Sequence, residues 1–292
     1  MKGKIVMRYN KKLYPAIADR AFKRILWVEA WFFEFIVGLA RYGIPRISTR
    51  GYRFLKRNDS LVIIANGPSI SMQIEEISKR EDCDFACMNY FPLYSEYFDK
   101  LRPRYFFGTD VMLYNEKHPD PVKVQDTKKL RKKLNNIDWN MIAFMYRDES
   151  LLLENKKIKE IRLTNYMIDG VYSQFRGFLF DHNLAVPATR TVATYAIQTG
   201  IRLGYRKIYV YGVDMSQHEG VRIEKNGLQN EDIHFYESDK KENTYKNDFV
   251  GVCETNYFSL RSFRTLNKYA DKKGCRVYNC SNHSYVDAFD KE

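Results

Sequence analysis

One short apolar run followed by a tight turn constrains the fold of this chain more than any other stretch. Residues 61–65 read Leu-Val-Ile-Ile-Ala, and Asn66-Gly67-Pro68-Ser69 follows directly. A wholly apolar run of this length that ends at Gly and Pro is typical of a strand buried on both faces of a parallel sheet. The sequence therefore predicts an α/β fold built on a parallel sheet.

The residues after this turn predict a helix over 70–77. Its apolar positions recur at helical spacing, and Ser69 or Ser71 is placed to cap the first turn. A strand, a glycine turn and a helix N-terminus present free backbone N–H groups and a positive dipole end at the carboxyl edge of the sheet. We therefore expect a nucleotide phosphate to bind here. The turn is neither a GxGxxG nor a Walker motif, so a turn without a ligand is the alternative.

Two more predicted strands end in small polar residues. The stretch 84–89 ends in an asparagine, and the stretch 104–110 ends in Thr109 and Asp110. Ligands of an open parallel sheet bind at the carboxyl ends of its strands. We therefore expect these side chains to converge with Asn66 on one crevice. Taken singly, each is explained more simply as a turn-forming residue.

Further elements complete the predicted fold. Strands are predicted over 139–146, 207–214 and 275–280, and helices over 115–136, within 187–204 and over 254–273. The strand over 207–214 ends in Gly212 and Asp214, which adds both residues to the expected crevice. Residues 150–183 follow no clear period, and we predict no element for them.

Hydrophobic periodicity disappears between Ser216 and about Gly251. An insertion of this length in a compact domain is usually a lid or a binding loop. We therefore expect a lid over about 216–251. It holds several side chains suited to binding or proton transfer, namely His218, Arg222, His234, Tyr236 and Tyr245.

Residues 1–57 form a basic extension that we expect to lie close to a membrane. A 16-residue apolar stretch, 25–40, lies between basic clusters and is interrupted by Glu29 and Glu34. As a helix it measures about 24 Å, too short and too charged to span a bilayer, and it lies too far into the chain for a signal peptide. Its aromatic residues and flanking charges predict an amphipathic helix on an anionic membrane surface. Packing on the rest of the protein, or in an oligomer interface, is the alternative.

The charge and the cysteines limit the class of partner. A formal net charge of +12 indicates an anionic partner, such as a membrane surface, a nucleotide or nucleic acid, or an acidic glycan. No nucleic-acid-binding module is recognisable, so we expect no nucleic-acid partner. The five cysteines lack metal-ligand spacing, and their odd number without a signal peptide favours a reducing, cytoplasmic setting. We therefore predict no metal site.

Several of these stretches together resemble the bacterial sialyltransferases of glycosyltransferase family 42. The shared features are the Asn-Gly-Pro-Ser turn, the strand that ends in Asn89, the Ala-Thr-Arg-Thr loop at 188–191, and the strand Gly-Tyr-Arg-Lys-Ile-Tyr-Val-Tyr-Gly-Val-Asp that ends at Asp214 and precedes the lid. The resemblance covers roughly residues 60–285.

The resemblance implies a Rossmann-like domain, a GT-A-like variant, over 58–292, with helices on both faces and the lid insertion. It implies metal-independent, inverting transfer of sialic acid, or of a related keto-sugar acid such as Kdo or a nonulosonate other than sialic acid, from a CMP-linked donor to a cell-surface glycan. We expect no required cofactor, with Mg²⁺ at most stimulatory. The expected setting is lipopolysaccharide or capsule biosynthesis on the inner face of the cytoplasmic membrane, with an oligosaccharide or lipid-linked glycan acceptor and a homo-oligomeric enzyme.

Site roles follow from the same resemblance. It implies that Asn66 and Ser69 meet the donor's phosphate and sugar, and that Asn89 lies on the cytidine side. Arg190 and Thr191 are expected beside the donor carboxylate or the acceptor. The full expected donor-binding set is Asn66, Gly67, Ser69, Asn89, Thr109, Arg190, Thr191, Gly212, Ser216, Arg222 and Tyr236.

A general base must take the proton of the acceptor hydroxyl. The family's catalytic histidine follows a glycine near the end of the lid, whereas here Gly251 is followed by valine. We therefore choose His234 first and His283 second. Asp110 and Asp214 are carboxylate alternatives if burial raises their pKa, although Asp214 is also typical of an acid that anchors backbone N–H groups. Stabilisation of the leaving phosphate is assigned to the first helix N-terminus with Arg222, Tyr236 or Tyr245.

Two other classes of protein are alternatives. A nucleotide-binding enzyme of the pterin-pyrophosphokinase-like or flagellin-modification type resembles this chain at the Asn-Gly-Pro-Ser turn. Its phosphoryl transfer would require Mg²⁺ and a carboxylate cluster, which Asp110 and Asp214 could supply. A nucleic-acid-binding protein is suggested by the charge alone.

Deletion of residues 1–50 tests the predicted membrane contact. We expect the full chain to sediment with vesicles of anionic lipid and the shortened chain to remain in the supernatant, because the deletion removes the apolar stretch and its basic flanks together. Vesicles of neutral lipid are the control. Equal sedimentation of the two chains with anionic vesicles would contradict the prediction.

Overall fold

A computed structural model divides the chain into two compact units, Met1–Arg46 and Ile47–Glu292. The residues that the structure describes are 55–114, 121–146, 149–225, 227–230, 243–244 and 248–292. All but the last three residues of the predicted N-terminal extension lie outside these ranges, as do His234, Tyr236 and Tyr245. Within the described ranges, no helix is both long enough and apolar enough to cross a bilayer.

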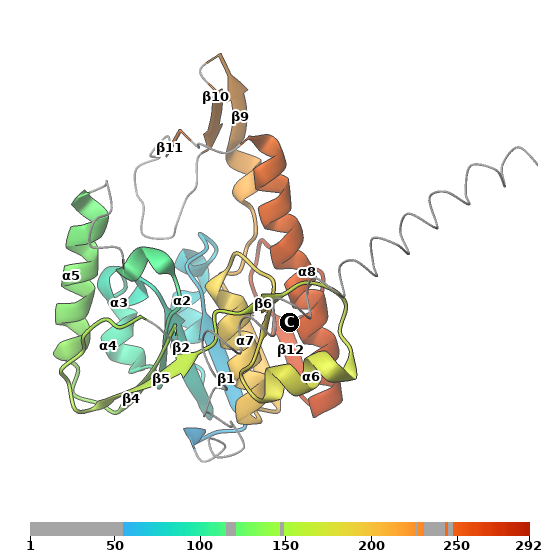
Figure 1. The fold of residues 1–292 in the computed structure, drawn as a ribbon. Helices are drawn as coiled ribbons and strands as arrows, with labels where there is room; N and C mark the ends of the chain where they lie inside the picture. The colour runs from blue at the N-terminus through green and yellow to red at the C-terminus, as the bar shows by residue number, and fades with distance from the viewer. Residues whose placement is uncertain (1–54, 115–120, 147–148, 226, 231–242, 245–247) are drawn as a thin grey trace, which may run out of the picture. The chain divides into compact units, whose positions relative to one another are not determined.

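An eight-stranded sheet forms the centre of the larger unit (Figure 1). Every pair of neighbouring strands in it is parallel. This confirms the predicted α/β fold with a Rossmann-like parallel sheet. In spatial order the strands are β13 (Asp290–Lys291), β12 (Arg276–Asn279), β8 (Lys207–Tyr211), β1 (Ser60–Ile64), β2 (Cys83–Met88), β3 (Tyr105–Gly108), β4 (Met141–Tyr146) and β5 (Ile158–Leu163).

The order of strands reverses at β1. Its neighbours are β2 on one side and β8 on the other, so Ile64 pairs with Cys87 and with Tyr211. The four residues from Leu61 to Ile64 are all buried, which confirms the strand predicted to be covered on both faces. Such a switch point opens a crevice outside the carboxyl ends of the strands.

Helices cover both faces of the sheet (Figure 1). On one face, α2 packs Ile70, Ile74 and Ile77 into a core cluster with Val62 and Ile64. Side chains of α3, α4 and α5 join the same cluster. The opposite face is covered by α7, which contacts β1, β2, β3 and β8, and α8 packs on α7 and on β12. The bounds are α2 (Ile70–Ile77), α3 (Phe91–Tyr94), α4 (Tyr97–Leu101), α5 (Pro121–Asn135), α6 (Gln174–Asp181), α7 (Val192–Leu203) and α8 (Phe249–Lys273), and η2 (Val111–Tyr114) follows β3.

The helix α7 is buried along its whole length. Its small residues allow this close packing, as predicted for the stretch 187–204. A Cβ atom at Gly200 would lie 2.8 Å from Leu61 Cδ2 and 2.9 Å from Ile208 Cδ1, so the helix backbone rests directly on β1 and β8. This packing fixes the N-terminus of α7 near the carboxyl edge of the sheet.

The insertion after β8, where we predicted a lid without regular elements, contains secondary structure. It comprises η3 (Gln217–Gly220), β9 (Val221–Glu224), β10 (Gly227–Asn230) and β11 (Asn243–Thr244), and the three strands form an antiparallel sheet. The helix α8 begins at Phe249, a few residues before the predicted start at 254, because the Asp248 side chain accepts a hydrogen bond from Gly251 N at 3.0 Å. The stretch left without prediction holds β5, β6 (Met167–Ile168) and α6.

A buried carboxylate holds the opposite, amino-terminal edge of the sheet together. Asp84, at the start of β2, accepts hydrogen bonds from Arg57 N at 2.8 Å and from Asn58 N at 3.3 Å. The hydroxyl of Tyr205 also donates to Asp84, and it lies 2.8 Å from the hydroxyl of Tyr105. Asp84 therefore joins β2 to the segments that precede β1 and β8.

Substitution of this carboxylate tests that role. We expect Asp84→Ala to lower the free energy of unfolding by about 2–4 kcal/mol, because several donors lose their acceptor at a buried position. Asp287→Ala is the control: its ion pair with Arg264 is exposed, and exposed pairs contribute about 0–1 kcal/mol. Urea denaturation of both variants gives the comparison. Equal stabilities would show that Asp84 is not an anchor.

Candidate functional site

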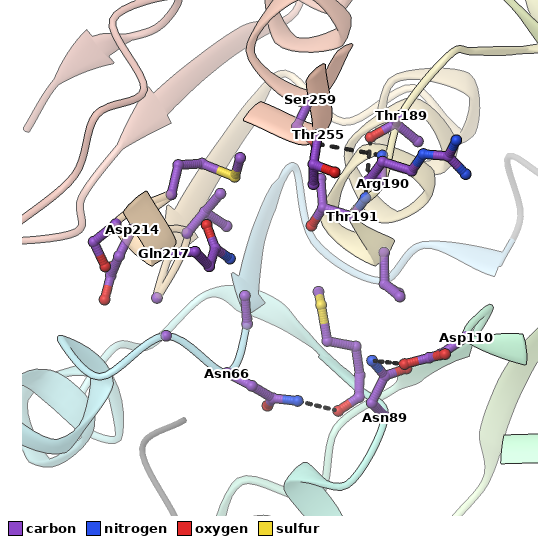
Figure 2. A pocket seen from close by; sticks show the side chains of 18 of the residues that line it. Asn66, Asn89, Asp110, Thr189, Arg190, Thr191, Asp214, Gln217, Thr255 and Ser259 are labelled. Atoms are coloured by element: carbon purple, nitrogen blue, oxygen red, sulfur yellow. Dashed lines mark hydrogen bonds between the residues drawn. The ribbon is translucent and has the colours of Figure 1, made fainter. Parts of the chain in front are cut away.

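A cleft of about 680 Å³ lies at the carboxyl ends of the strands (Figure 2). Its walls come from the ends of β1, β2, β3 and β8, the N-terminus of α7, η3 and the segment after β12. The structure brings most of the sequence-predicted residues together there. They are Asn66, Gly67, Asn89, Thr109, Asp110, Arg190, Thr191, Gly212, Asp214, Ser216 and His283.

Four predicted residues are not part of the described cleft. Ser69 is buried behind the turn, and Arg222 lies on β9 of the small antiparallel sheet, so neither lines the cleft. His234 and Tyr236 fall outside the residues that the structure describes.

The turn after β1 has its backbone N–H groups at Gly67, Ser69 and Ile70 engaged, although the sequence led us to expect free N–H groups there. Gly67 N donates to Gly212 O at 2.8 Å, and Ile70 N donates to Gly67 O at 3.2 Å. Ser69 N donates to Asp214 Oδ2 at 2.9 Å, and Ser69 Oγ donates to Asp214 Oδ1 at 2.6 Å. Neither Ser69 nor Ser71 caps α2 with its side chain. The protein's own carboxylate therefore occupies the position at the start of α2 where we predicted a phosphate.

Close packing explains why residue 67, just before the Ser69–Asp214 contact, is a glycine. A Cβ atom at Gly67 would lie 2.5 Å from Gly212 O and 2.6 Å from Asp214 Oδ2. Both Gly67 and Gly212 are therefore needed for the backbone segments after β1 and β8 to meet. Burial raises the pKa of the Asp214 carboxyl, while the hydrogen bonds from Ser69 act in the opposite direction. With both oxygens engaged, Asp214 is better suited to anchoring than to proton transfer.

Two asparagines form the wall at the ends of β1 and β2. Asn66 Nδ2 donates to Met88 O and Asn89 Nδ2 donates to Asp110 Oδ2, each at 3.4 Å (Figure 2). Asn89 has a left-handed backbone with φ of 49°, a conformation that asparagine tolerates better than most residues. The turn it makes directs the chain away from the sheet immediately after the strand.

Three buried oxygen atoms in this wall have no hydrogen-bond partner among the residues that the structure describes. They are Oδ1 of Asn66, Oδ1 of Asn89 and Oγ1 of Thr109, and all three residues line the cleft. Buried polar atoms without a partner are rare in folded proteins. Their concentration at the ends of three neighbouring strands indicates a surface that hydrogen-bonds to a ligand.

The opposite wall is the loop that leads into α7. Figure 2 shows Thr189, Arg190 and Thr191 across the cleft from Asn66 and Asn89. Thr189 Oγ1 lies 2.8 Å from Thr194 Oγ1, which lies 2.9 Å from Ser262 Oγ in α8. These contacts hold the loop against two helices. Arg190 is the only arginine or lysine among the described residues that line the cleft, and its side chain is exposed.

Sequence reasoning missed several residues of the cleft. Tyr146, at the end of β4, packs edge-on against Tyr195 of α7 with ring centroids 5.4 Å apart, and burial raises the pKa of Tyr195. Glu219 of η3 lies 2.9 Å from Nε2 of His283. The sequence could have revealed Tyr146, since it ends a predicted strand as the other cleft residues do. It could not have revealed Glu219, because Glu219 lies in a stretch without periodicity.

The described residues do not supply the carboxylate cluster on which the pyrophosphokinase-like alternative depends. Among them, no group of three or more His, Cys, Asp or Glu side chains is arranged to hold a metal ion. Asp214 is directed to Ser69, and Asp110 accepts from Asn89 and from Met112 N at 2.9 Å. The two aspartates are therefore engaged with different protein donors.

Comparison with known proteins finds similarity in solved structures. No family model and no curated protein matches the chain. It is similar to the sialyltransferase CstII from Campylobacter jejuni in complex with CMP-3FNeuAc, with 14% identity and a TM-score of 0.39 over 80% of this chain and 85% of that one. It is also similar to the sialyltransferase CST-II in complex with a trisaccharide acceptor and CMP, with 15% identity and a TM-score of 0.42 over the same shares. These are similarities of fold.

The role of Asp214 is tested by two substitutions. Asp214→Ala is expected to lower the free energy of unfolding by about 1–3 kcal/mol, because the buried Ser69 N–H and hydroxyl lose their acceptor. Asp214→Asn is expected to cost less, since its amide oxygen still accepts from Ser69 N and its amide N–H₂ donates to Ser69 Oγ. Urea denaturation measures both. Equal losses of stability in the two variants would contradict the anchoring role.

Proposed function

We propose that this protein is a glycosyltransferase that moves sialic acid, or a related keto-sugar acid, from a CMP-linked donor to a hydroxyl group of a glycan acceptor. The main support is the group of unpartnered oxygens of Asn66, Asn89 and Thr109 at one cleft. The cleft lies at the switch point of a parallel sheet, where such folds bind ligands. The motifs that resemble family 42 add the class of donor.

The cleft has the chemistry that a nucleotide-linked acidic sugar requires. Such a donor carries many hydroxyl groups, an amino group on cytosine, a phosphate and a carboxylate. The amide oxygens of Asn66 and Asn89 accept hydrogen bonds from hydroxyl and amino groups. Arg190 supplies a permanent positive charge and planar donors that suit a carboxylate or phosphate. A volume of about 680 Å³ is within the usual range for a small-molecule site.

The position of Asp214 supports a proposal on the side of the cleft where the donor's phosphate binds. A phosphate placed against the start of α2 would meet a carboxylate already hydrogen-bonded to Ser69. Like charges at short distance repel each other strongly in a partly buried site. We therefore assign the phosphate to the opposite wall, where Arg190 and the N-terminus of α7 lie. This replaces the binding mode that the turn alone suggested.

The reaction is a displacement at the anomeric carbon. The acceptor hydroxyl gives its proton to a base, its oxygen bonds to the carbon, and the bond to the phosphate oxygen breaks with its electron pair so that CMP leaves. Of the predicted bases in the described cleft, His283 lies at the rim and Asp110 is held by Asn89 and Met112 N. We favour His283, because a neutral imidazole nitrogen can accept the proton of the acceptor hydroxyl. His234 stays a sequence-based prediction.

The remaining expectations on partners are part of this proposal. The acceptor would be an oligosaccharide or a lipid-linked glycan, and the basic N-terminal extension would hold a homo-oligomeric enzyme at the inner face of the cytoplasmic membrane. Such an arrangement is consistent with a role in lipopolysaccharide or capsule biosynthesis.

Thermal unfolding with CMP, CDP, UDP, GDP and ADP tests the donor class. We expect CMP to stabilise the protein selectively, by about 2.7 kcal/mol at a concentration 100 times Kd. Asn66→Ala and Asn89→Ala are expected to weaken CMP binding about tenfold each, because each removes a hydrogen-bond acceptor from the site. Asn136→Ala, at an exposed position after α5, is the matched control and is expected to bind CMP as the wild type does.

Equal stabilisation by all five nucleotides, or by none, would contradict the proposed donor. Unchanged CMP affinity in both cleft variants would contradict the proposed site. A requirement for Mg²⁺ in nucleotide binding would favour the pyrophosphokinase-like alternative.

A further inference from the structure

A carboxylate, an imidazole and a phenol meet at the rim of the cleft. His283 Nε2 lies 2.9 Å from Glu219 Oε1, and the hydroxyl of Tyr285 donates to the same oxygen at 2.6 Å. The three residues come from two segments, because Glu219 belongs to η3 and the other two follow β12. Both Glu219 and His283 line the cleft.

The segment that carries the histidine is firmly attached to the end of β8. Ser284 Oγ donates to Val213 O at 2.7 Å, and Tyr285 N donates to Asp214 O at 2.9 Å. Val213 N in turn donates to Ser281 Oγ at 3.1 Å. His283 therefore lies within a short loop that is hydrogen-bonded on both sides to the strand end forming the cleft floor.

The contact with Glu219 determines which nitrogen of His283 can accept a proton. A carboxylate accepts hydrogen bonds, so Nε2 carries the hydrogen and Nδ1 keeps its lone pair. Nδ1 makes no hydrogen bond within the part of the chain that the structure describes. The imidazole of this cleft-lining residue thus has one nitrogen held by Glu219 and one without a partner among the described residues, and a general base needs such a free nitrogen.

We propose that Glu219 is a positioning residue that makes His283 the general base of the transfer, with Tyr285 orienting the carboxylate. This inference rests on the proposed function. In the step, the acceptor O–H bond breaks and its proton passes to Nδ1 of His283. The acceptor oxygen bonds to the anomeric carbon while the bond to the phosphate oxygen breaks and CMP leaves with the electron pair. The imidazolium then returns its proton to solvent.

The charged groups around His283 favour this role. Glu219 lies 2.9 Å from Nε2 of His283, and Asp214, whose oxygens are hydrogen-bonded to Ser69, interacts with His283 electrostatically. The hydrogen bond from Tyr285, followed by that from His283, holds the pKa of Glu219 below its ordinary value, so the carboxylate is ionised. His218 packs edge-on against Tyr285 with ring centroids 4.5 Å apart, and Lys291 acts on Asp214 from β13.

If the Glu219–His283 pair served only to stabilise the fold, removing the Glu219 charge would lower the unfolding temperature. The side chains of His283 and Glu219 are 60% and 44% exposed. Exposed ion pairs contribute little to the stability of the fold. Loss of the Glu219 charge should therefore leave the unfolding temperature nearly unchanged, and any loss of turnover reports on the chemistry at His283.

The test uses Glu219→Gln, His283→Ala and Tyr285→Phe in the full chain. Turnover is followed as CMP release from CMP-N-acetylneuraminic acid and from CMP-Kdo with water as acceptor, across pH 5 to 9. His182→Gln is the matched control, since His182 ends α6 away from the cleft. CMP binding by thermal shift is measured for every variant.

We expect His283→Ala to lower kcat by about 10²–10⁴-fold and Glu219→Gln by roughly tenfold or more, with KM for the donor changed less than twofold. Tyr285→Phe should lie between Glu219→Gln and the wild type. Because Gln cannot stabilise the imidazolium by charge, the acidic limb of the pH–rate profile should move to lower pH in Glu219→Gln. All variants should bind CMP as the wild type does.

Two outcomes separate this inference from the function on which it rests. If the wild type binds CMP and releases it from either donor, but Glu219→Gln keeps the wild-type kcat and pH profile, the positioning role is wrong and the proposed function stands. If the wild type neither binds CMP nor releases it from either donor, the proposed function fails and this inference fails with it.

Discussion

Two hydrogen bonds from Ser69 to the Asp214 carboxylate join the start of α2 to the end of β8 across 145 residues of sequence. They close the switch point of the sheet, and they require the backbone segments at Gly67 and Gly212 to touch. The Ser69–Asp214 contact shapes the cleft floor, because it holds the ends of β1 and β8 together. The same carboxylate occupies the positive end of α2, where the sequence led us to expect a phosphate.

The division of the cleft into two walls follows from that constraint. One wall, at the ends of β1, β2 and β3, presents unpartnered oxygens and is suited to hydroxyl and amino groups. The other, at the start of α7, presents Arg190 and the positive end of a helix. A donor with a polar nucleoside and an anionic linkage has both kinds of group. The Glu219–His283 pair also lines this cleft.

The sequence predicted the parts of this account that depend on local pattern. The helix over 70–77 begins and ends as predicted, because its apolar spacing and its flanking turn lie within ten residues. Convergence of Asn66, Asn89 and Asp214 followed from the rule for parallel strands. What local pattern could not reveal is pairing at long range. The turn at Ser69 suggested free N–H groups, and only the fold shows that Ser69 N donates to Asp214 and Gly67 N to Gly212 O. Likewise, His283 could be named, but its partner Glu219 lies 64 residues away in a stretch without a period.

A crystal structure of the protein with CMP would test the central claim most directly. The account predicts the nucleotide in the cleft at the β1–β8 switch point, with hydrogen bonds to Oδ1 of Asn66 and of Asn89. It also predicts the phosphate on the side of Arg190, with the contact between Asp214 and Ser69 intact. A nucleotide bound outside this cleft, or a phosphate at the start of α2 with Asp214 displaced, would contradict it.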